Sequence, residues 1–229
     1  MDYEITNRPS YAMAELSLEA GEQVLAEAGA MVSHSQGIEM TTNATGGFLT
    51  SLKRGLLGGE SFFQNTFTAE RAGTLSLAPA LPGDIVHHEL TDETVYVQSG
   101  SYIASEPDLD VDTEFGGART FFGSEGLFLL EVSGAGPLFL SSYGAIEAVD
   151  LADTEPFTID TGHVVAFEEG TDFTVERVGG LKSTLLSGEG LVARFAGSGR
   201  VWLQTRSQDS LLSWLVPKVQ AQVQSGSSG

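Results

Sequence analysis

The stretch LKRGLLGGES, residues 52–61, has a near copy in LKSTLLSGEG, residues 181–190, and a shorter version in ARTFFGSEG, residues 118–126. Each version places a basic residue before an apolar pair, small residues and a glutamate. The basic residues are Lys53, Arg119 and Lys182, and the glutamates, which lie 65 and 64 residues apart, are Glu60, Glu125 and Glu189. Such a recurrence at a nearly fixed period is the signature of a repeat architecture.

The sequence around these turns repeats as well. Each glutamate is followed by an alternating apolar run, a glycine-containing turn and a second run, which is typical of a β-hairpin. Upstream, two β-rich segments flank Gly29, Gly100 and Gly162, and an acidic connector and a further strand follow each pair. We therefore predict one domain, residues 1–206, of three β repeats at about 1–79, 80–144 and 145–206.

One repeat alone has too small a hydrophobic core to fold stably, whereas three repeats packed together can share a core and protect their edge strands. The predicted fold class is all-β, with three antiparallel β-sandwich units in a pseudo-threefold arrangement. After Arg206 the pattern changes to a short helix at 207–219, with Asp209 or Ser210 as N-cap and Pro217 near its end. Residues 220–229 are predicted to be a disordered tail.

The charge balance narrows the classes of partner. The chain has 31 acidic residues against 11 basic ones, a net charge of -20, and no cysteine. Such a surface repels phosphodiester backbones, so no nucleic-acid partner is expected. No apolar run reaches the roughly 18 residues that span a bilayer, and no signal peptide is recognised. We expect a cytoplasmic protein, with peripheral membrane association left open.

The histidines offer one approach to a metal site. His88, Glu89 and His163 would be its ligands, which would suit a metal-dependent, cupin-like enzyme. His87 and His88 are adjacent, however, so on a strand they point to opposite faces. No other catalytic constellation is found, so the sequence predicts neither an enzyme, nor catalytic residues, nor a cofactor.

The repeated basic-to-glutamate turns have two interpretations. They form salt bridges that pin each hairpin entry, or they form a collar that binds an anion, a ligand headgroup or a partner. The candidate binding residues are Lys53, Arg54, Glu60, Arg119, Glu125, Lys182 and Glu189. The first turn also carries apolar residues where a surface loop is ordinarily polar, and this candidate contact loop comprises Phe48, Leu49, Leu52, Leu56 and Leu57.

Three stretches carry a resemblance to a known family: GGFLTSLKRGLLGGESFFQNTFTA, LSGEGLVARFAGSGRVWLQTR and SLLSWLVP. They resemble the altered-inheritance-of-mitochondria family of mitochondrial biogenesis proteins and its prokaryotic relatives, over nearly the whole chain. The resemblance implies a triplicated version of the tryptophan RNA-binding attenuation protein fold, a short double-stranded β-helix or β-sandwich unit. Fold kinship does not transfer function, and the acidity of this chain argues against RNA binding.

Together these features favour a non-enzymatic β scaffold or binding protein that contacts a protein or a membrane-associated assembly. We also expect a homo-oligomer. A small-ligand binding protein with a pocket between repeats is the first alternative, with the ligand unspecified, and the metal-dependent enzyme is the second.

The acidic, lysine-poor composition suits a salt-rich cytoplasm, because salt screens the self-repulsion of a highly charged surface. We therefore predict a halophilic protein whose melting temperature rises between about 0.1 and 3 M KCl. Calorimetry across that range measures it, and a melting temperature that does not change would contradict a halophilic origin.

Overall fold

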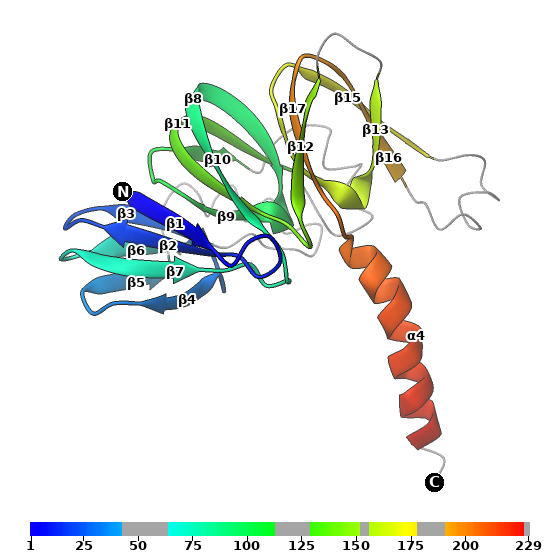
Figure 1. Ribbon diagram of the computed structural model, residues 1–229, viewed down its shortest axis with the longest axis horizontal. Helices are drawn as coiled ribbons and strands as arrows, with labels where there is room; N and C mark the ends of the chain where they lie inside the picture. Colours follow the sequence, from blue (N-terminus) through cyan, green and yellow to red (C-terminus); the bar gives the residue numbers. More distant parts are fainter. Residues whose placement is uncertain (43–63, 113–128, 152–155, 178–190, 227–229) are drawn as a thin grey trace.

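The computed structural model describes residues 1–42, 64–112, 129–151, 156–177 and 191–226, and its regular structure is almost entirely β (Figure 1). We call the three predicted repeats segments 1, 2 and 3. Segment 1 contains β1 (Asp2–Thr6), β2 (Met13–Leu18), β3 (Gln23–Glu27), β4 (Met31–His34), β5 (Ile38–Thr42), β6 (Gln64–Ala69) and β7 (Gly73–Leu77).

Segment 2 contains β8 (Ile85–Gln98), the 3-10 turn η2 (Ser99–Ser101), β9 (Tyr102–Ser105), β10 (Asp110–Asp112) and β11 (Leu129–Ser141). Segment 3 contains β12 (Ile146–Leu151), β13 (Phe157–Asp160), the 3-10 turn η4 (Thr161–His163), β14 (Val164–Glu168), β15 (Thr171–Arg177), β16 (Leu191–Gly197) and β17 (Gly199–Gln204). A helix, α4 (Gln208–Gly226), follows the strands.

The same antiparallel pairing occurs inside all three segments. The opening strand pairs with the closing one: β2 with β7, the first half of β8 with the second half of β11, and β12 with β17. The strand before the aligned glycine pairs with the first strand of the hairpin: β3 with β6, the second half of β8 with the first half of β11, and β13 with β16. The internal repeat is therefore a repeat of strand pairing as well as of sequence.

Even an irregularity recurs. β4 pairs with β7, β9 with β11 and β14 with β17, and each pairing skips one residue as a β-bulge does. The skipped residues are Val32, Ile103 and Val165, each of which stands three positions after its aligned glycine. Because bulges re-aim a strand, the three copies bend at the same place.

Strand pairing also joins neighbouring segments. β3 of segment 1 pairs with β9 of segment 2, and β8 of segment 2 pairs with β14 of segment 3. These two junctions merge the segments into a ten-stranded sheet, while β1-β2-β7-β4 and β13-β16-β15 form smaller sheets at the two ends. Among the described strands, the third junction that would close a threefold ring, β13 with β4, is not formed.

The hydrophobic cores straddle these junctions. The core built mainly from segment 1 includes Ile103, Ala104 and Phe139 of segment 2, and the core built mainly from segment 2 includes Ala166 and Trp202 of segment 3. All five side chains are buried. Neighbouring segments thus complete one another's cores, as expected of units that are too small to bury their apolar faces alone.

The predicted all-β fold with a C-terminal helix is confirmed, but the predicted helix ends are wrong. The helix begins at Gln208, because the Ser207 hydroxyl accepts a hydrogen bond from Ser210 N at 3.2 Å and so acts as the N-cap in place of Asp209 or Ser210. It also continues through Pro217 to Gly226, over most of the stretch predicted as a tail. A proline removes only its own N–H and one carbonyl contact, and the good helix formers that follow it sustain the next turns.

The junction core provides a stability prediction. Phe167 of β14 is fully buried and packs on Phe173 and Phe195 of its own segment and, across the junction, on Tyr96 of segment 2, with ring centroids 4.8, 5.3 and 5.3 Å away. Phe157 of β13 is 37% exposed. We expect Phe167→Ala to lower the free energy of unfolding by about 3–5 kcal/mol, and the matched Phe157→Ala by at most about 2 kcal/mol. Urea unfolding followed by circular dichroism measures both, and equal losses would contradict the burial of Phe167 in this core.

Candidate functional site

The predicted binding turns lie outside the described residues. This applies to Lys53, Arg54, Glu60, Arg119, Glu125, Lys182 and Glu189, and to the contact loop Phe48, Leu49, Leu52, Leu56 and Leu57. The collar and contact-loop hypotheses therefore stay predictions.

The structure does not assemble the metal site considered for His88, Glu89 and His163. His88 Nε2 lies 3.2 Å from Glu93 Oε1, and His163 Nδ1 lies 2.7 Å from the backbone oxygen of Gln204. Within the described ranges, no group of three or more His, Asp or Glu side chains is placed to hold a metal ion. The candidate metal site is therefore wrong. Neighbouring residues of a strand point to opposite faces of the sheet, so the side chains of His88 and Glu89 do not converge.

His87 and His88 show this alternation directly. His87 stacks near Tyr3 with ring centroids 4.4 Å apart and its Nε2 lies 3.1 Å from Glu89 Oε2, while His88 meets Trp202 edge-on at 5.0 Å. Burial lowers the pKa of His87, and the nearby Glu89 carboxylate opposes that shift. Both rings serve packing between strands.

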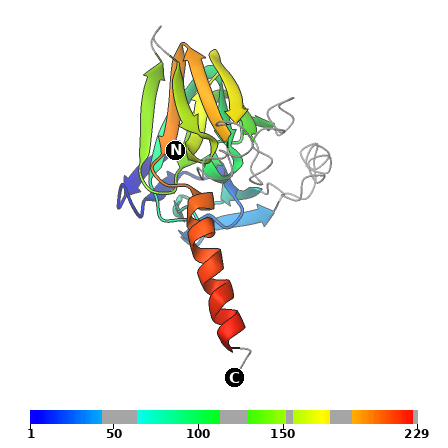
Figure 2. The same ribbon diagram turned by 90° about the vertical axis from the view of Figure 1, so that its right-hand side faces the viewer.

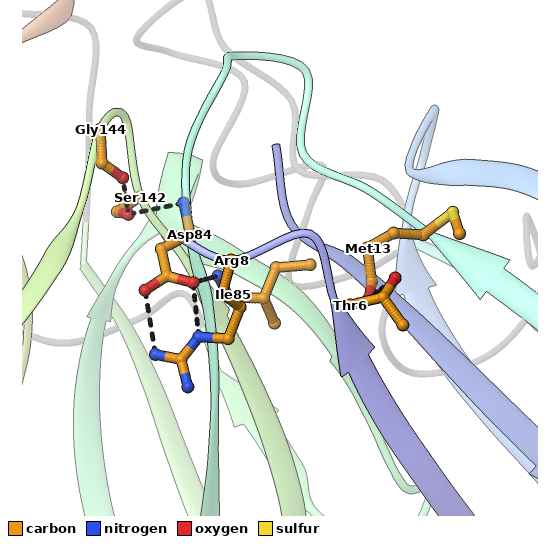
Figure 3. A network of polar contacts seen from close by, with 7 residues as sticks. All are labelled: Thr6, Arg8, Met13, Asp84, Ile85, Ser142 and Gly144. Atoms are coloured by element: carbon orange, nitrogen blue, oxygen red, sulfur yellow. Dashed lines mark hydrogen bonds and ion pairs between the residues drawn. The ribbon is translucent and has the colours of Figure 1, made fainter. Parts of the chain in front are cut away.

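A charge-assisted network ties segment 1 to segment 2 (Figure 3). Arg8 donates from Nε and Nη2 to the two carboxylate oxygens of the buried Asp84, at 2.7 and 2.9 Å. Asp84 also accepts from Ile85 N, and its own backbone N–H donates to the hydroxyl of Ser142, which in turn donates to Gly144 O at 2.7 Å. This bidentate arrangement is the strong form of an ion pair, and both carboxylate oxygens of Asp84 have a protein partner, so the network fastens the fold.

A second polar cluster lies at the first junction. The fully buried Tyr102 hydroxyl accepts from Gln64 Nε2 at 2.7 Å, lies 2.8 Å from Ser105 Oγ and donates to Leu25 O at 3.4 Å. Burial raises the pKa of Tyr102, and it raises the pKa of the neighbouring Glu27 to about 7. Glu27 is thus a carboxyl group with a raised pKa on β3, the strand that enters the first junction.

Glu27 belongs to a repeated polar position that the sequence analysis missed. It stands two residues before its aligned glycine, as do Gln98 and Asp160 in the other segments. Asp160 accepts a hydrogen bond from Gly162 N at 2.9 Å, whereas Gln98 Nε2 is, of the buried side-chain nitrogen and oxygen atoms described, the one without a hydrogen-bond partner. The glycine alignment carried the signal, since a polar residue stands two positions before the glycine in all three segments.

Helix α4 presents a different kind of surface. It extends away from the strands in both views (Figures 1 and 2). Six of its apolar side chains are between 39% and 67% exposed, and they are Leu212, Trp214, Leu215, Val216, Val219 and Val223. In the described part of the chain, no helix is long and apolar enough to cross a membrane.

Comparison with known proteins places the chain in a family. The model of the family described as Mitochondrial biogenesis AIM24 matches residues 3–206, which cover all three segments. The chain belongs to the mitochondrial biogenesis AIM24 family. Helix α4 lies just beyond the residues that the AIM24 model matches.

Two relatives of this AIM24 chain come from Streptococcus pyogenes. An uncharacterized protein of the serotype M6 strain is 29% identical over 213 residues, which are 90% of this chain and 86% of that protein. A crystal structure of a Streptococcus pyogenes protein superposes with a TM-score of 0.79 at 28% identity, over 95% of this chain and 99% of the other. The family resemblance and the fold are thereby confirmed, and neither relative has a stated activity.

Glu27 generates a pH prediction. Because the folded-state pKa of about 7 lies above the ordinary carboxyl value of 4.5, the folded state binds more protons between these values, and stability falls as pH rises through them. We expect Glu27→Gln to remove this fall, so that the variant exceeds the wild type by about 1–3 kcal/mol at pH 8 and matches it at pH 4. Urea unfolding at both pH values measures this. A difference in stability between variant and wild type that is the same at pH 4 and pH 8 would contradict a desolvated Glu27.

Proposed function

We propose that this AIM24 protein is a non-enzymatic binding scaffold whose β domain presents helix α4 to a protein partner. The observation that carries the proposal is the row of exposed apolar side chains on α4. Soluble monomeric proteins seldom leave contiguous apolar surface in water, and when they do it commonly marks an interaction site.

The spacing along α4 favours a partner with an apolar groove or a partner helix. Leu212, Val216, Val219 and Val223 follow one another at intervals of four, three and four residues. On an α-helix this spacing aligns them in one stripe, like the a and d positions of a coiled coil. Helix-in-groove recognition uses the same arrangement of anchors.

The fold presents this stripe in a defined direction. Ser207, which caps the helix, is buried in the β domain, and Leu211 N donates to Ser207 O at 3.2 Å. Further along, the Lys218 ammonium lies 5.2 Å from the centre of the Trp214 ring, which supports the exposed turn around Pro217. The cap of the helix is therefore buried, while the length of the helix is available for contact.

A protein partner fits this surface better than a lipid one. Helices that lie on membranes typically carry a polar face rich in Lys and Arg, whereas Lys218 is the single basic residue of α4 and Asp209 adds a negative charge. The net charge of -20 also repels anionic lipid headgroups.

Site-specific photocrosslinking in source cells tests the proposal. We expect a photoreactive residue at Val219, on the stripe, to capture a discrete protein, and the same residue at Ala221, on the opposite face, to capture at least about tenfold less. The double variant Leu212→Ser/Val216→Ser should abolish the capture at Val219. Equal capture from both faces, or no capture, would refute a protein partner at the stripe.

A flotation assay with anionic vesicles tests the alternative, that the stripe binds a membrane. The wild type should stay with the soluble fraction at physiological salt. If the wild type floats with the vesicles and Leu212→Ser/Val216→Ser does not, the partner of the stripe is a membrane surface and not a protein.

A further inference from the structure

The two junctions between segments obey one geometrical rule. At the first, Ala26, three residues before its aligned glycine, pairs with Ala104, four residues after the next glycine. At the second, Val97 and Ala166 stand at those same positions and pair in the same way. The adjacent pairs, Leu25 with Ser105 and Tyr96 with Phe167, also correspond. At both junctions, therefore, the strand before the glycine of one segment pairs with the strand after the glycine of the following segment, in the same register.

Among the described strands, this rule leaves one strand before a glycine and one strand after a glycine without a partner from another segment. β4, the strand after the glycine in segment 1, pairs on one side with β7, and β13, the strand before the glycine in segment 3, pairs on one side with β16. Among the described strands, neither has a partner on its other side. Figure 1 places these two strands at different ends of the molecule.

The exposure of equivalent residues distinguishes these two edges from the two formed junctions. The bulge residue Val32 on β4 is 55% exposed, while its equivalents Ile103 and Val165 are fully buried. On β13, Phe157 is 37% exposed, while its equivalents Val24 and Val95 are fully buried. The apolar side chains at the two edges are therefore those that a third junction would cover.

We infer that β13 of one molecule pairs with β4 of a second copy, head to tail, and builds the same junction between chains that joins the segments within a chain. The rule sets the register: Ile159 opposite Ser33, Thr158 opposite His34 and Phe157 opposite Ser35. An exposed strand edge is a ready template for such pairing, and the main-chain hydrogen bonds supply the contact.

The side chains at this predicted junction are compatible with association. None of the three pairs sets two like charges opposite each other, a placement that would be unfavourable. Repulsion between two copies of net charge -20 acts at longer range and is screened by salt, so association should strengthen with KCl. A head-to-tail contact closes into a ring or extends into a filament, according to its rotation. The inference is independent of the partner proposed for α4.

Disulfide trapping tests the inference cleanly, because the natural chain contains no cysteine. Thr158→Cys and His34→Cys are prepared as separate proteins at exposed positions, mixed at high protein and KCl concentration, and oxidised. We expect a two-chain species in the mixture and almost none from either variant alone, since residues directly opposite in a strand pair come close enough for a disulfide.

The matched control shifts the register by one residue. In Ser33→Cys mixed with Thr158→Cys, the side chains point to opposite faces of the sheet, and the yield should fall at least about tenfold. A substitution of Phe157 by Asp in the Thr158→Cys chain should also suppress the product. Circular dichroism and melting curves like those of the wild type verify that each variant is folded.

Three results would overturn the inference. The first is equal yield from the in-register and shifted mixtures, which indicates random collision. The second is no two-chain product at any KCl concentration. The third is an intrachain disulfide in the double variant Thr158→Cys/His34→Cys, without products between chains, which means that the third junction closes within one molecule.

Discussion

The structure depends on the antiparallel pairing between segments, β3 with β9 and β8 with β14. Each segment alone exposes one face of its sheet and leaves strand edges open, and pairing with the next segment covers both. Residues of the incoming strand, such as Ile103 and Ala104, become part of the preceding segment's core. The hydrogen-bonded ladder and the hydrophobic contact thus form together, which explains why the three repeats make one domain.

Polar groups reinforce the same places. Arg8 and Asp84 clamp the chain where segment 1 passes into segment 2, and the Tyr102 hydroxyl collects bonds from strands on both sides of the first junction. Buried polar groups contribute stability only when their partners are in place, so these contacts favour one register over its neighbours. Glu27 is the exception, because burial there disfavours its charged form. The carboxyl group of Glu27 therefore makes the stability of this region depend on pH.

The sequence allowed the repeat and the all-β fold to be predicted because glycine turns and alternating apolar residues recur with the same spacing. It did not allow the pairing between segments to be predicted, since the junction strands contain ordinary apolar residues such as Ala26 and Ala104, which carry no sign of their partner. The extent of α4 was missed because Pro217 suggested a stop that its helical surroundings override. Glu27 and Asp84 were missed because their significance comes from burial, which appears only after strands distant in sequence meet.

Both proposals concern surfaces that the fold leaves uncovered, and the central claim is that β4 and β13 are two halves of an unformed junction. Hydrogen exchange at increasing protein concentration in high KCl tests it most directly. The account predicts that amides of β9 and β14 are protected at every concentration, while the amides of β4 and β13 that point away from β7 and β16 become protected together only as concentration rises. Protection of these open-edge amides that is independent of concentration, or that never appears, would contradict it.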